Sequence, residues 1–412
     1  MSDNKPRTLH FALILGAMTA ILPMAVDMYL PALPALAQSL EVDPSRVQLT
    51  LSTFFVGVAG GQLLHGPLSD RYGRRPLMLT GLTLYVLASA GCAVASSVEM
   101  LMALRFVQAL GACAGMVISL AVIRDSFPPE DGARMISRMM LVLGLAPILA
   151  PLVGGQLLGW FGWRSIFWFL TLYGVACFVA VTIFLPETRP AHTKGPTSIR
   201  TWVQGFAGVL AHRRFVGFAL TRGLATAGMF SYIAGSPFVF IVLFGVPPEH
   251  FGWLFGLNAI GLIAATQLNV HLLKFRSSEQ LAGISVRVSA VAGLLLVAAA
   301  LLPHSLGWAA FAALLVPLFF CVATNGLINP NVTSLGMAPF GDRAGTASAL
   351  LGSISFMVAG IASAVVSSFP ARSALPMALT IAAVELLAVF AFFVIALPAP
   401  AMPMTASTKP SH

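Results

Sequence analysis

The sequence predicts an all-α membrane protein with twelve transmembrane helices, arranged as two six-helix halves around a central cavity. Of its 412 residues, 58% are apolar and only 9% are charged, whereas about 25% of a typical soluble domain is charged. So few charged groups cannot give a protein of this length a polar surface. The apolar residues also fall into runs of about 20, the length that crosses a bilayer as a helix.

Each run is bounded by charged residues, proline or glycine, which gives twelve predicted spans. The first six cover 10–33, 47–66, 76–96, 100–122, 136–158 and 163–185. The second six cover 215–244, 251–272, 282–302, 305–327, 344–368 and 375–397.

Composition and motifs exclude several function classes. The net charge of +9 does not indicate nucleic-acid binding, because the basic residues lie between apolar runs and not on one solvated face. The sequence has no phosphate-binding loop of the ATPase type, no histidine spacing typical of a metal site, and no catalytic constellation or large sensing domain. We therefore expect neither an enzyme nor a receptor, and no cofactor or metal. An ion gradient is the expected energy source.

The distribution of lysine and arginine predicts the orientation. With a cytoplasmic N-terminus, 17 of the 23 basic residues fall on the cytoplasmic side. The opposite side holds Arg46, Arg164 and Arg372, and the spans contain Arg105, Arg222 and Arg287. By the positive-inside rule, both termini are expected in the cytoplasm.

The longest polar connection, 187–214, follows the sixth span and divides the chain in two. The predicted units are an N-terminal half (1–186), a cytoplasmic linker (187–214) and a C-terminal half (215–412) with a short cytoplasmic tail. A shift of 205 residues places Gln62 on Gln267 and Arg71 on Arg276, a weak internal repeat. Repeats of this kind are typical of transporters whose substrate site lies between the halves.

Only two acids, Asp27 and Glu385, lie well inside a predicted span. A charge there costs at least about 2.5 to 3.5 kcal/mol, so Asp27 must face a partner or a water-filled cavity. The prolines that follow it, Pro31 and Pro34, loosen the helix on its outward side. Two interpretations stay open: a proton-coupling acid, which we favour, or a permanently ionised acid paired with an arginine.

Arg105 is the predicted partner of Asp27. With Gln108 and Ser119 it lies on one polar face of the fourth span. An arginine cannot be deprotonated usefully, so its expected role is to hold charge and tune Asp27. Glu385 has no evident partner and is expected in a helix contact or, less readily, as a proton carrier. Arg222 and Arg287 lie nearer the cytoplasmic ends of their spans and are expected to snorkel.

The fifth span carries small and kinking residues on one face, where another helix can approach closely. They are Gly144, Pro147, Pro151 and Gly154. Ordinary tight packing and a gating role are both open for this face.

The loop after the second span, residues 61–76, reads GQLLHGPLSDRYGRRP. It resembles the signature loop of the major facilitator superfamily, and Arg105, Gln108 and Gly111 match the motif of that superfamily's fourth span. The proline-glycine stretch 144–155 looks like the motif of the drug/proton antiporter group. The stretch DMYLP at 27–31, with the whole first half, is similar to the Bcr/CflA drug-resistance subfamily.

The resemblance implies the major facilitator fold, a gating role for Asp70, Arg71 and Arg74 at the cytoplasmic face, and proton coupling at the acid matching Asp27. We expect a proton-coupled antiporter in the bacterial inner membrane that works as a monomer. Its expected cargo is small antimicrobial compounds such as bicyclomycin and phenicol-type drugs. The alternative is a carrier of a metabolite such as an amino acid or short peptide.

The substrate cavity is expected to take side chains from both halves. The predicted lining is Asp27, Tyr29, Arg105 and Ala146 from one half and Phe230, Tyr232 and Asn258 from the other, with Phe54 and Phe55 at its edge.

Overall fold

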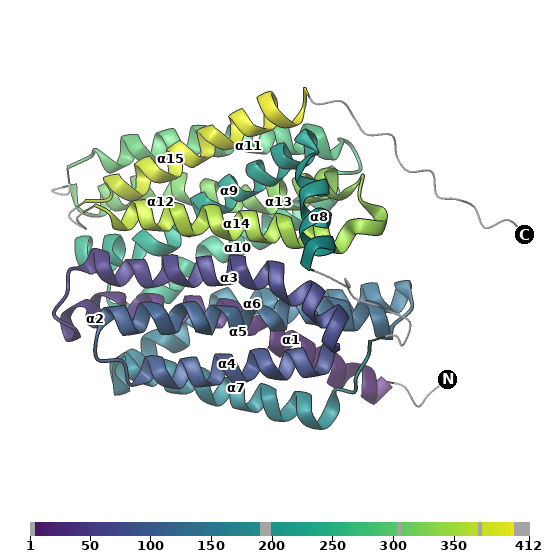
Figure 1. Cartoon of the computed structure of the whole chain (residues 1–412). Helices are drawn as coiled ribbons and strands as arrows, with labels where there is room; N and C mark the ends of the chain where they lie inside the picture. Colours follow the sequence, from purple (N-terminus) through teal and green to yellow (C-terminus); the bar gives the residue numbers. More distant parts are fainter. Residues whose placement is uncertain (1–4, 190–198, 304–305, 370–372, 399–412) are drawn as a thin grey trace, which may run out of the picture.

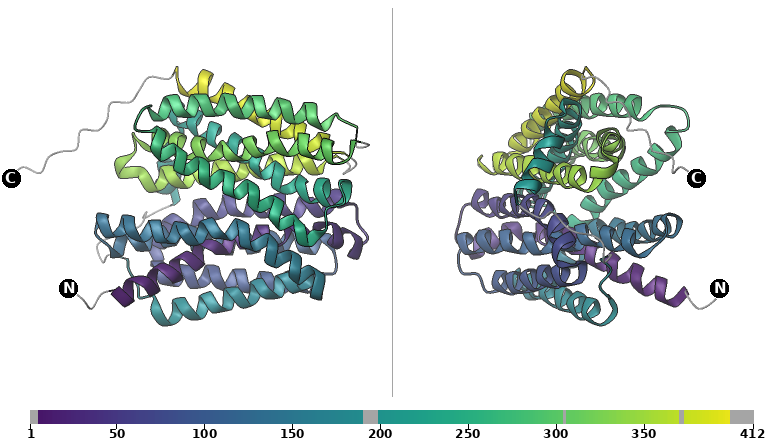
Figure 2. Two further views of the ribbon diagram at one scale, coloured as in Figure 1. Left: turned by 180° about the vertical axis from the view of Figure 1, so that it is seen from behind. Right: turned by 45° about the vertical axis from the view of Figure 1, so that its right-hand side comes forward.

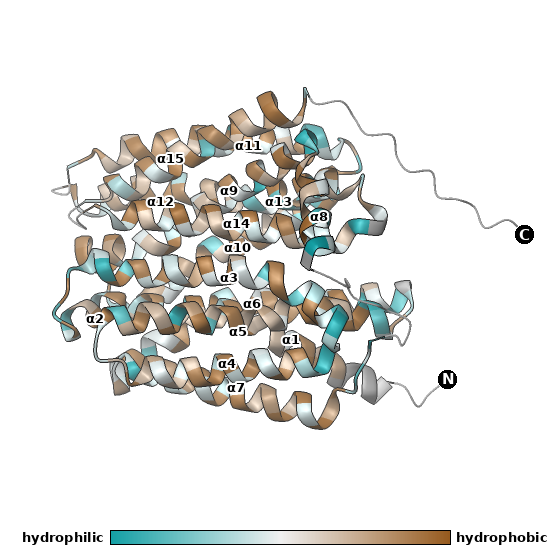
Figure 3. Ribbon diagram, viewed as in Figure 1, coloured by the Kyte–Doolittle hydropathy of each residue, from teal (hydrophilic) through white to brown (hydrophobic). Residues whose placement is uncertain are grey.

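The computed structural model describes residues 5–189, 199–303, 306–369 and 373–398. These residues are almost entirely helical and include no strand. Twelve helical segments are long and apolar enough to cross a membrane, and they run roughly alongside one another (Figure 1). Hydrophobic residues dominate their middles and polar residues gather at their ends (Figure 3).

The N-terminal half contains the first six spans. The first span is α1 with the short segments η1 and α2, and each later span is one helix. The bounds are α1 Lys5–Asp27, η1 Leu30–Ala32, α2 Leu33–Ser39, α3 Pro44–Tyr72, α4 Arg74–Ala93, α5 Val98–Ser126, α6 Pro129–Phe161 and α7 Arg164–Phe184.

The C-terminal half contains the other six spans, three of which are interrupted or change their winding. The bounds are α9 Arg213–Pro237, η2 Phe238–Leu243, α10 Pro248–Leu272, α11 Ser278–Ala300, α12 Trp308–Ala323, α13 Asn325–Met337, η4 Gly341–Arg343, α14 Ala344–Ser367, α15 Leu375–Phe390 and η5 Ala391–Ala396.

The two halves meet along two helix pairs. Helix α14 packs along α3, and α10 packs along α6. Figure 2 shows the N-terminal half (purple to blue) and the C-terminal half (green to yellow) on either side of this boundary. The boundary is therefore made by the second, fifth, eighth and eleventh spans.

The spans follow the sequence prediction, although the first and second end six residues later than predicted, at Ser39 and Tyr72, and two larger differences occur. The tenth span was predicted to end near residue 327, but its helices continue to Met337. The prediction stopped early because three asparagines (Asn325, Asn329 and Asn331) lower the apolar character of the second part of this span. The linker also contains a helix that the prediction lacked, α8 Ile199–Leu210, which packs on α14. Residues 190–198 of that linker, Arg372 and the tail from 399 lie outside the described residues.

Candidate functional site

Helix α1 ends at Asp27, close to the boundary between the halves. Pro31 has no N–H to continue the helix, and the backbone passes into η1, with Tyr29 N–H bonded to the Val26 carbonyl. The carbonyl of Ala25, which an uninterrupted helix would bond to the Tyr29 N–H, is left for another donor. The helix is thus interrupted on the C-terminal side of Asp27, where Pro31 lies.

Arg105 of α5 takes that free carbonyl. Its Nη1 donates to the Ala25 carbonyl at 2.9 Å and to the Gln108 side-chain oxygen at 2.6 Å. The guanidinium also lies over three aromatic rings, Phe54 at 4.2 Å, Tyr29 at 4.8 Å and Phe167 at 5.9 Å. Each such contact is worth about 2 kcal/mol when desolvated. We call Tyr29, Phe54, Arg105, Gln108 and Phe167 the Arg105 cluster.

The Arg105 cluster lies inside the N-terminal half. Arg105, Tyr29 and Phe54 are fully buried, and the Tyr29 hydroxyl pairs with Thr50 of α3 at 3.0 Å. These three were predicted to line the central cavity, but their described contacts are all with the N-terminal half. Tyr29 follows Ala25 by four positions, about one helical turn, so it lies on the face of the chain that meets Arg105.

Asp27 is not paired with Arg105. No ion pair within 4.0 Å joins them, and the Asp27 carboxyl has no hydrogen bond to any described residue. Positions 25 and 27 point about 200° apart on a helix, so the face of α1 that meets Arg105 is not the one that carries Asp27. The described residues therefore show no ion pair between Asp27 and Arg105, and their pairing stays a prediction.

Asp27 is 5% exposed and lies within electrostatic range of the Tyr232 hydroxyl of α9, across the boundary. That hydroxyl accepts a hydrogen bond from the Asn258 amide of α10 at 3.2 Å, while the Asn258 carbonyl oxygen is buried without a partner among the described residues. The carboxyl thus lies on the side of the boundary opposite a bonded phenol and amide.

Aromatic rings continue this group along the boundary. Phe55 of α3 contacts Phe230 of α9 with ring centroids 4.3 Å apart, and Phe230 contacts Phe356 of α14 at 5.6 Å. We call Asp27, Phe55, Phe230, Tyr232 and Asn258 the boundary cluster. Phe356 was not predicted and has no distinctive sequence context. Ala146 of α6 is buried, but no described contact joins it to the cluster.

At the end of the bundle opposite the start of α1, the helices of the two halves pack closely together. A side chain at Gly154 of α6 would meet the Met28 carbonyl at 2.1 Å, and one at Gly155 would meet the Pro248 carbonyl of α10 at 3.0 Å. The fifth-span motif therefore brings α6 against both α1 and α10, whereas Gly144 has only Ile263 nearby, at 3.8 Å. Pro147 and Pro151 both lie within α6.

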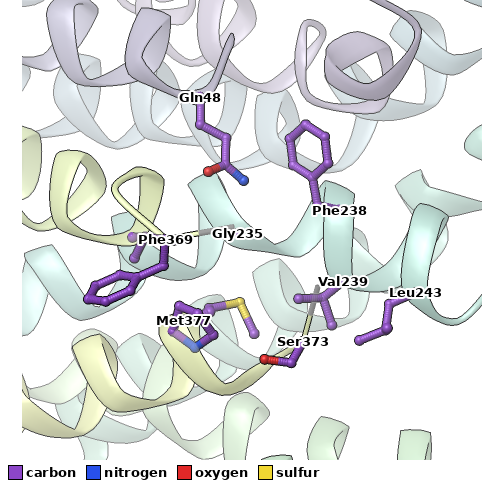
Figure 4. Close-up of a pocket in the computed structure, with 10 residues that line it drawn as sticks. Gln48, Gly235, Phe238, Val239, Leu243, Phe369, Ser373 and Met377 are labelled. Carbon is purple, nitrogen blue, oxygen red and sulfur yellow. The ribbon is translucent and has the colours of Figure 1, made fainter. Parts of the chain in front are cut away.

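A small cavity of about 20 Å³ remains at this closed end. In Figure 4, Gln48 of α3 points from the N-terminal half toward Gly235, Phe238 and Met377 of the C-terminal half. The Gln48 side-chain oxygen has no hydrogen-bond partner among the described residues. The space suits about one water molecule, so the described residues leave no substrate-sized opening here.

The other end of the N-terminal half is held by Arg74. This side chain is 2% exposed and bonds Asp70 at 2.5 Å, Ser69 at 2.6 Å and Asp125 of α5 at 2.9 Å. The signature loop thus joins the ends of α3, α4 and α5. Arg71 is exposed and lies over the Tyr72 ring. The described contacts of these three predicted gating residues lie within the N-terminal half and with Glu187 and Arg189 at the start of the linker.

Glu187, which the sequence analysis did not select, completes this network. Its carboxylate accepts the backbone N–H of Arg74 at 2.9 Å, of Arg75 at 3.2 Å and of Arg189 at 2.9 Å. Gly73 adopts φ +103°, and a side chain there would meet the carboxylate at 2.5 Å. Desolvation pushes the pKa of Glu187 upward, but the backbone N–H donors outweigh it and hold the pKa below its usual value.

Comparison with known proteins decides the family. The Major Facilitator Superfamily model matches residues 15–364. This chain belongs to the major facilitator superfamily. It is 31% identical to a bicyclomycin resistance protein homolog of Haemophilus influenzae, over 95% of this chain and 97% of that one. It is 32% identical to a chloramphenicol resistance protein of Pseudomonas aeruginosa, over 91% of this chain and 88% of that one.

These relatives support the Bcr/CflA drug-resistance subfamily within the superfamily. The fold also matches the crystal structure of a D-xylose–proton symporter, with a TM-score of 0.71 and 16% identity over 96% of this chain and 98% of that one. This likeness shows the major facilitator fold alone. The chain is therefore a multi-pass membrane transporter, and the boundary cluster lies where transporters of repeated architecture bind substrate.

Proposed function

We propose that this protein is a proton-coupled antiporter that exports small antimicrobial compounds. The observation that carries the proposal is Asp27, a carboxyl without a hydrogen-bonding partner among the described residues, at the boundary between the two halves. An unpaired charge in such a place is costly, so the carboxyl favours its neutral form until water or a cationic group reaches it. A group that exchanges charge for a proton at this boundary can couple the two fluxes.

We place the end at which α1 begins in the cytoplasm of a bacterial cell, at its inner membrane. The arginine-rich loops at this end support that orientation. Both halves expose polar side chains here, among them Arg138 of α6 and Gln267 of α10. The close approach of α6 to α1 and α10 at Gly154 and Gly155, at the opposite end, supports an inward-facing state.

In the transport cycle, periplasmic protons neutralise Asp27 in the outward-facing state and displace the drug. The halves then rock about the α3–α14 and α6–α10 pairs. Asp27 releases its proton to the cytoplasm, and a new drug enters against Phe55, Phe230 and Tyr232. The membrane field adds about 2.3 kcal/mol per charge moved through 100 mV.

The drug class follows from the boundary cluster and the relatives together. Aromatic faces and a few polar groups suit compact, partly apolar molecules. Bicyclomycin and phenicol-type compounds fit that description, and the names of two relatives point to the same compounds. We propose that the protein works as a monomer and draws its energy from the proton gradient without a cofactor.

The test is drug-stimulated proton release from energised inverted vesicles. Addition of chloramphenicol or bicyclomycin should release protons with the native protein. Asp27→Asn should abolish this release, and cells expressing it should lose resistance. The matched control is Thr19→Val, which changes a buried α1 hydroxyl that bonds only backbone of its own helix and should leave release unchanged.

Two results would oppose the proposal. Full proton release by a folded Asp27→Asn variant would remove Asp27 from the coupling role. A native protein that moves amino acids or short peptides but neither confers resistance to these drugs nor responds to them would establish the metabolite carrier instead.

A further inference from the structure

A second buried carboxyl lies in the C-terminal half, away from the boundary cluster. Glu385, in the middle of α15, is fully buried, and among the described residues neither of its oxygens has a hydrogen-bond partner of normal distance and angle. A side chain at Gly228 of α9 would meet the carboxyl at 2.5 Å. The Ser289 hydroxyl of α11 lies near enough to act on the carboxyl as a donor, and Cys321 of α12 is a titratable neighbour.

Among the described residues, no charged side chain forms an ion pair with Glu385. Arg222 of α9 is six positions from Gly228, about 9 Å along the helix, and Arg287 of α11 is exposed and lies over Phe393 at 4.3 Å. Helices α12, α14 and α15 contribute no other charged residue, and the remaining titratable neighbour is Cys321. An ionised carboxylate here would lack both a counter-ion and solvent, so the carboxyl is neutral in this conformation.

A line of polar side chains leads from the carboxyl toward the end at which α1 begins. Thr324, at the break between α12 and α13, donates to the Ser289 hydroxyl at 3.0 Å. The next residue, Asn325, accepts from the Asn329 amide at 3.4 Å, and Asn329 accepts in turn from Thr226 of α9 at 3.4 Å. Asn329 is half-buried, whereas Asn325 is 1% exposed.

The direction of this line suits proton exit. Helix α13 runs from Thr324 toward the end that we place in the cytoplasm, and Asn329 is one turn nearer that end than Asn325. Hydroxyl and amide groups along a helix interruption give water molecules the two to four partners they need in an interior. Interrupted helices in transporters commonly border ion sites.

We propose that Glu385 is a second proton-binding site and that the transporter exchanges two protons for each drug molecule. The proposal rests on the proposed antiport function. One proton adds to a Glu385 carboxylate oxygen in the outward-facing state. The same O–H bond breaks when water reaches the carboxyl along the line through Thr324, Asn325 and Asn329, and the proton leaves to the cytoplasm. Asp27 binds the proton that competes directly with the drug.

The stoichiometry is measurable in proteoliposomes with chloramphenicol as the probe. At equilibrium, a tenfold proton gradient without membrane potential supports a chloramphenicol gradient of about tenfold for one exchanged proton and about hundredfold for two, since each tenfold ratio is worth the same free energy. We expect about hundredfold for the native protein. We expect about tenfold for Glu385→Gln, which keeps the size of the side chain but cannot ionise.

Thr380→Val is the matched control, because this α15 hydroxyl bonds only its own helix, at Pro376. It should keep the native gradient. Thr324→Val and Asn329→Leu alter the exit line and should slow the approach to equilibrium without changing its value, an effect that a merely structural role of Glu385 does not predict.

The remaining outcomes separate the two proposals. An unchanged gradient in Glu385→Gln overturns the second site. A native gradient of only about tenfold also overturns it, even where Glu385→Gln fails to fold, and leaves one-proton antiport at Asp27 standing. A native protein that forms no proton-linked chloramphenicol gradient refutes the antiport function itself.

Discussion

Arg105 in the N-terminal half and Glu385 in the C-terminal half are both fully buried ionisable residues, yet their surroundings differ. Arg105 has a backbone carbonyl and an amide oxygen at Nη1 and three aromatic faces around its guanidinium, although its Nε and Nη2 have no hydrogen-bond partner among the described residues. Glu385 has a glycine, a serine and a cysteine as neighbours, and its oxygens make no hydrogen bond of normal geometry to the described residues. The guanidinium is thus partly solvated by dipoles and aromatic rings, whereas the carboxyl has only the Ser289 hydroxyl near it.

The difference indicates what each group can do. A guanidinium that stays charged can hold other groups in position, and Arg105 holds α1 two residues before Asp27. A carboxyl that is stable only when neutral can accept a proton and must lose it when solvent arrives. Arg105, which stays charged, therefore positions Asp27 at the boundary. Glu385, whose charge can change, is suited to carry a proton.

Removing the fixed charge should have the largest effect. Arg105→Ala deletes two charge-assisted hydrogen bonds, each worth about 1.5 to 3 kcal/mol, and the aromatic contacts. We expect a loss of about 3 to 5 kcal/mol of stability and no transport, measured by thermal unfolding in detergent and by drug efflux. Arg105→Lys should keep the charge but recover only part of the stability. An Arg105→Ala protein with native unfolding temperature and efflux would show that α1 is positioned by other contacts.

The second contact that positions α1 can be tested at Gly154. Gly154→Leu forces a side chain into the Met28 backbone, and overpacking of this kind costs about 1 to 3 kcal/mol. We expect the closed end to open, which would raise thiol labelling of a cysteine introduced at Leu152. Gly159→Leu, on the same helix with nothing within 4 Å, should change nothing. Equal labelling in the two variants would argue against a role for this glycine in closure.

Much of the fold was predictable, because the thickness of the bilayer fixes the length of each span and the basic residues mark the loops on one side of the membrane. The tenth span was misjudged where Asn325, Asn329 and Asn331 line protein instead of lipid. Hydropathy averages over all faces of a helix, so a polar face inside the bundle resembles a loop in a linear reading.

The residues of the site could be predicted from the sequence, but the directions in which their side chains point could not. Asp27 and Arg105 stand out because intramembrane charge is costly, but the sequence does not tell which side of α1 each one meets. Tyr29 follows Ala25 by four positions, about one helical turn, and lies under the same guanidinium that bonds the Ala25 carbonyl, so its spacing from Ala25 would have indicated its direction. Glu187 gave no signal, since acids at the ends of spans are common and its partners are backbone groups.

The unsolvated acid can be tested through its neighbour. Gly228→Ala places a methyl group 2.5 Å from the Glu385 carboxyl and should cost about 1 to 3 kcal/mol by overpacking. Glu385→Ala in the same chain removes the clash. We expect the double variant to be more stable than the sum of the two single changes by about 0.5 to 3 kcal/mol, the range for residues in contact. Additive unfolding temperatures would show that the two residues do not touch in the membrane.

Glu187 supplies the opposite case, a carboxylate solvated by backbone N–H groups at a helix start. Because its folded pKa lies below the unfolded value, its contribution to stability is fully present above about pH 4.3 and is lost as the pH falls through the folded pKa. Glu187→Gln should therefore lower the stability at pH 7 by about 1 kcal/mol, the usual cost of a lost cap. The difference in stability from the native protein should shrink on acidification.

Thermal unfolding in detergent from pH 7 to pH 3 measures this difference, and Glu249→Gln, at an exposed position, is the control. A difference that stayed constant with pH would mean that the N–H donors stabilise the neutral side chain as well as the carboxylate, and the contrast with Glu385 would then rest on packing alone.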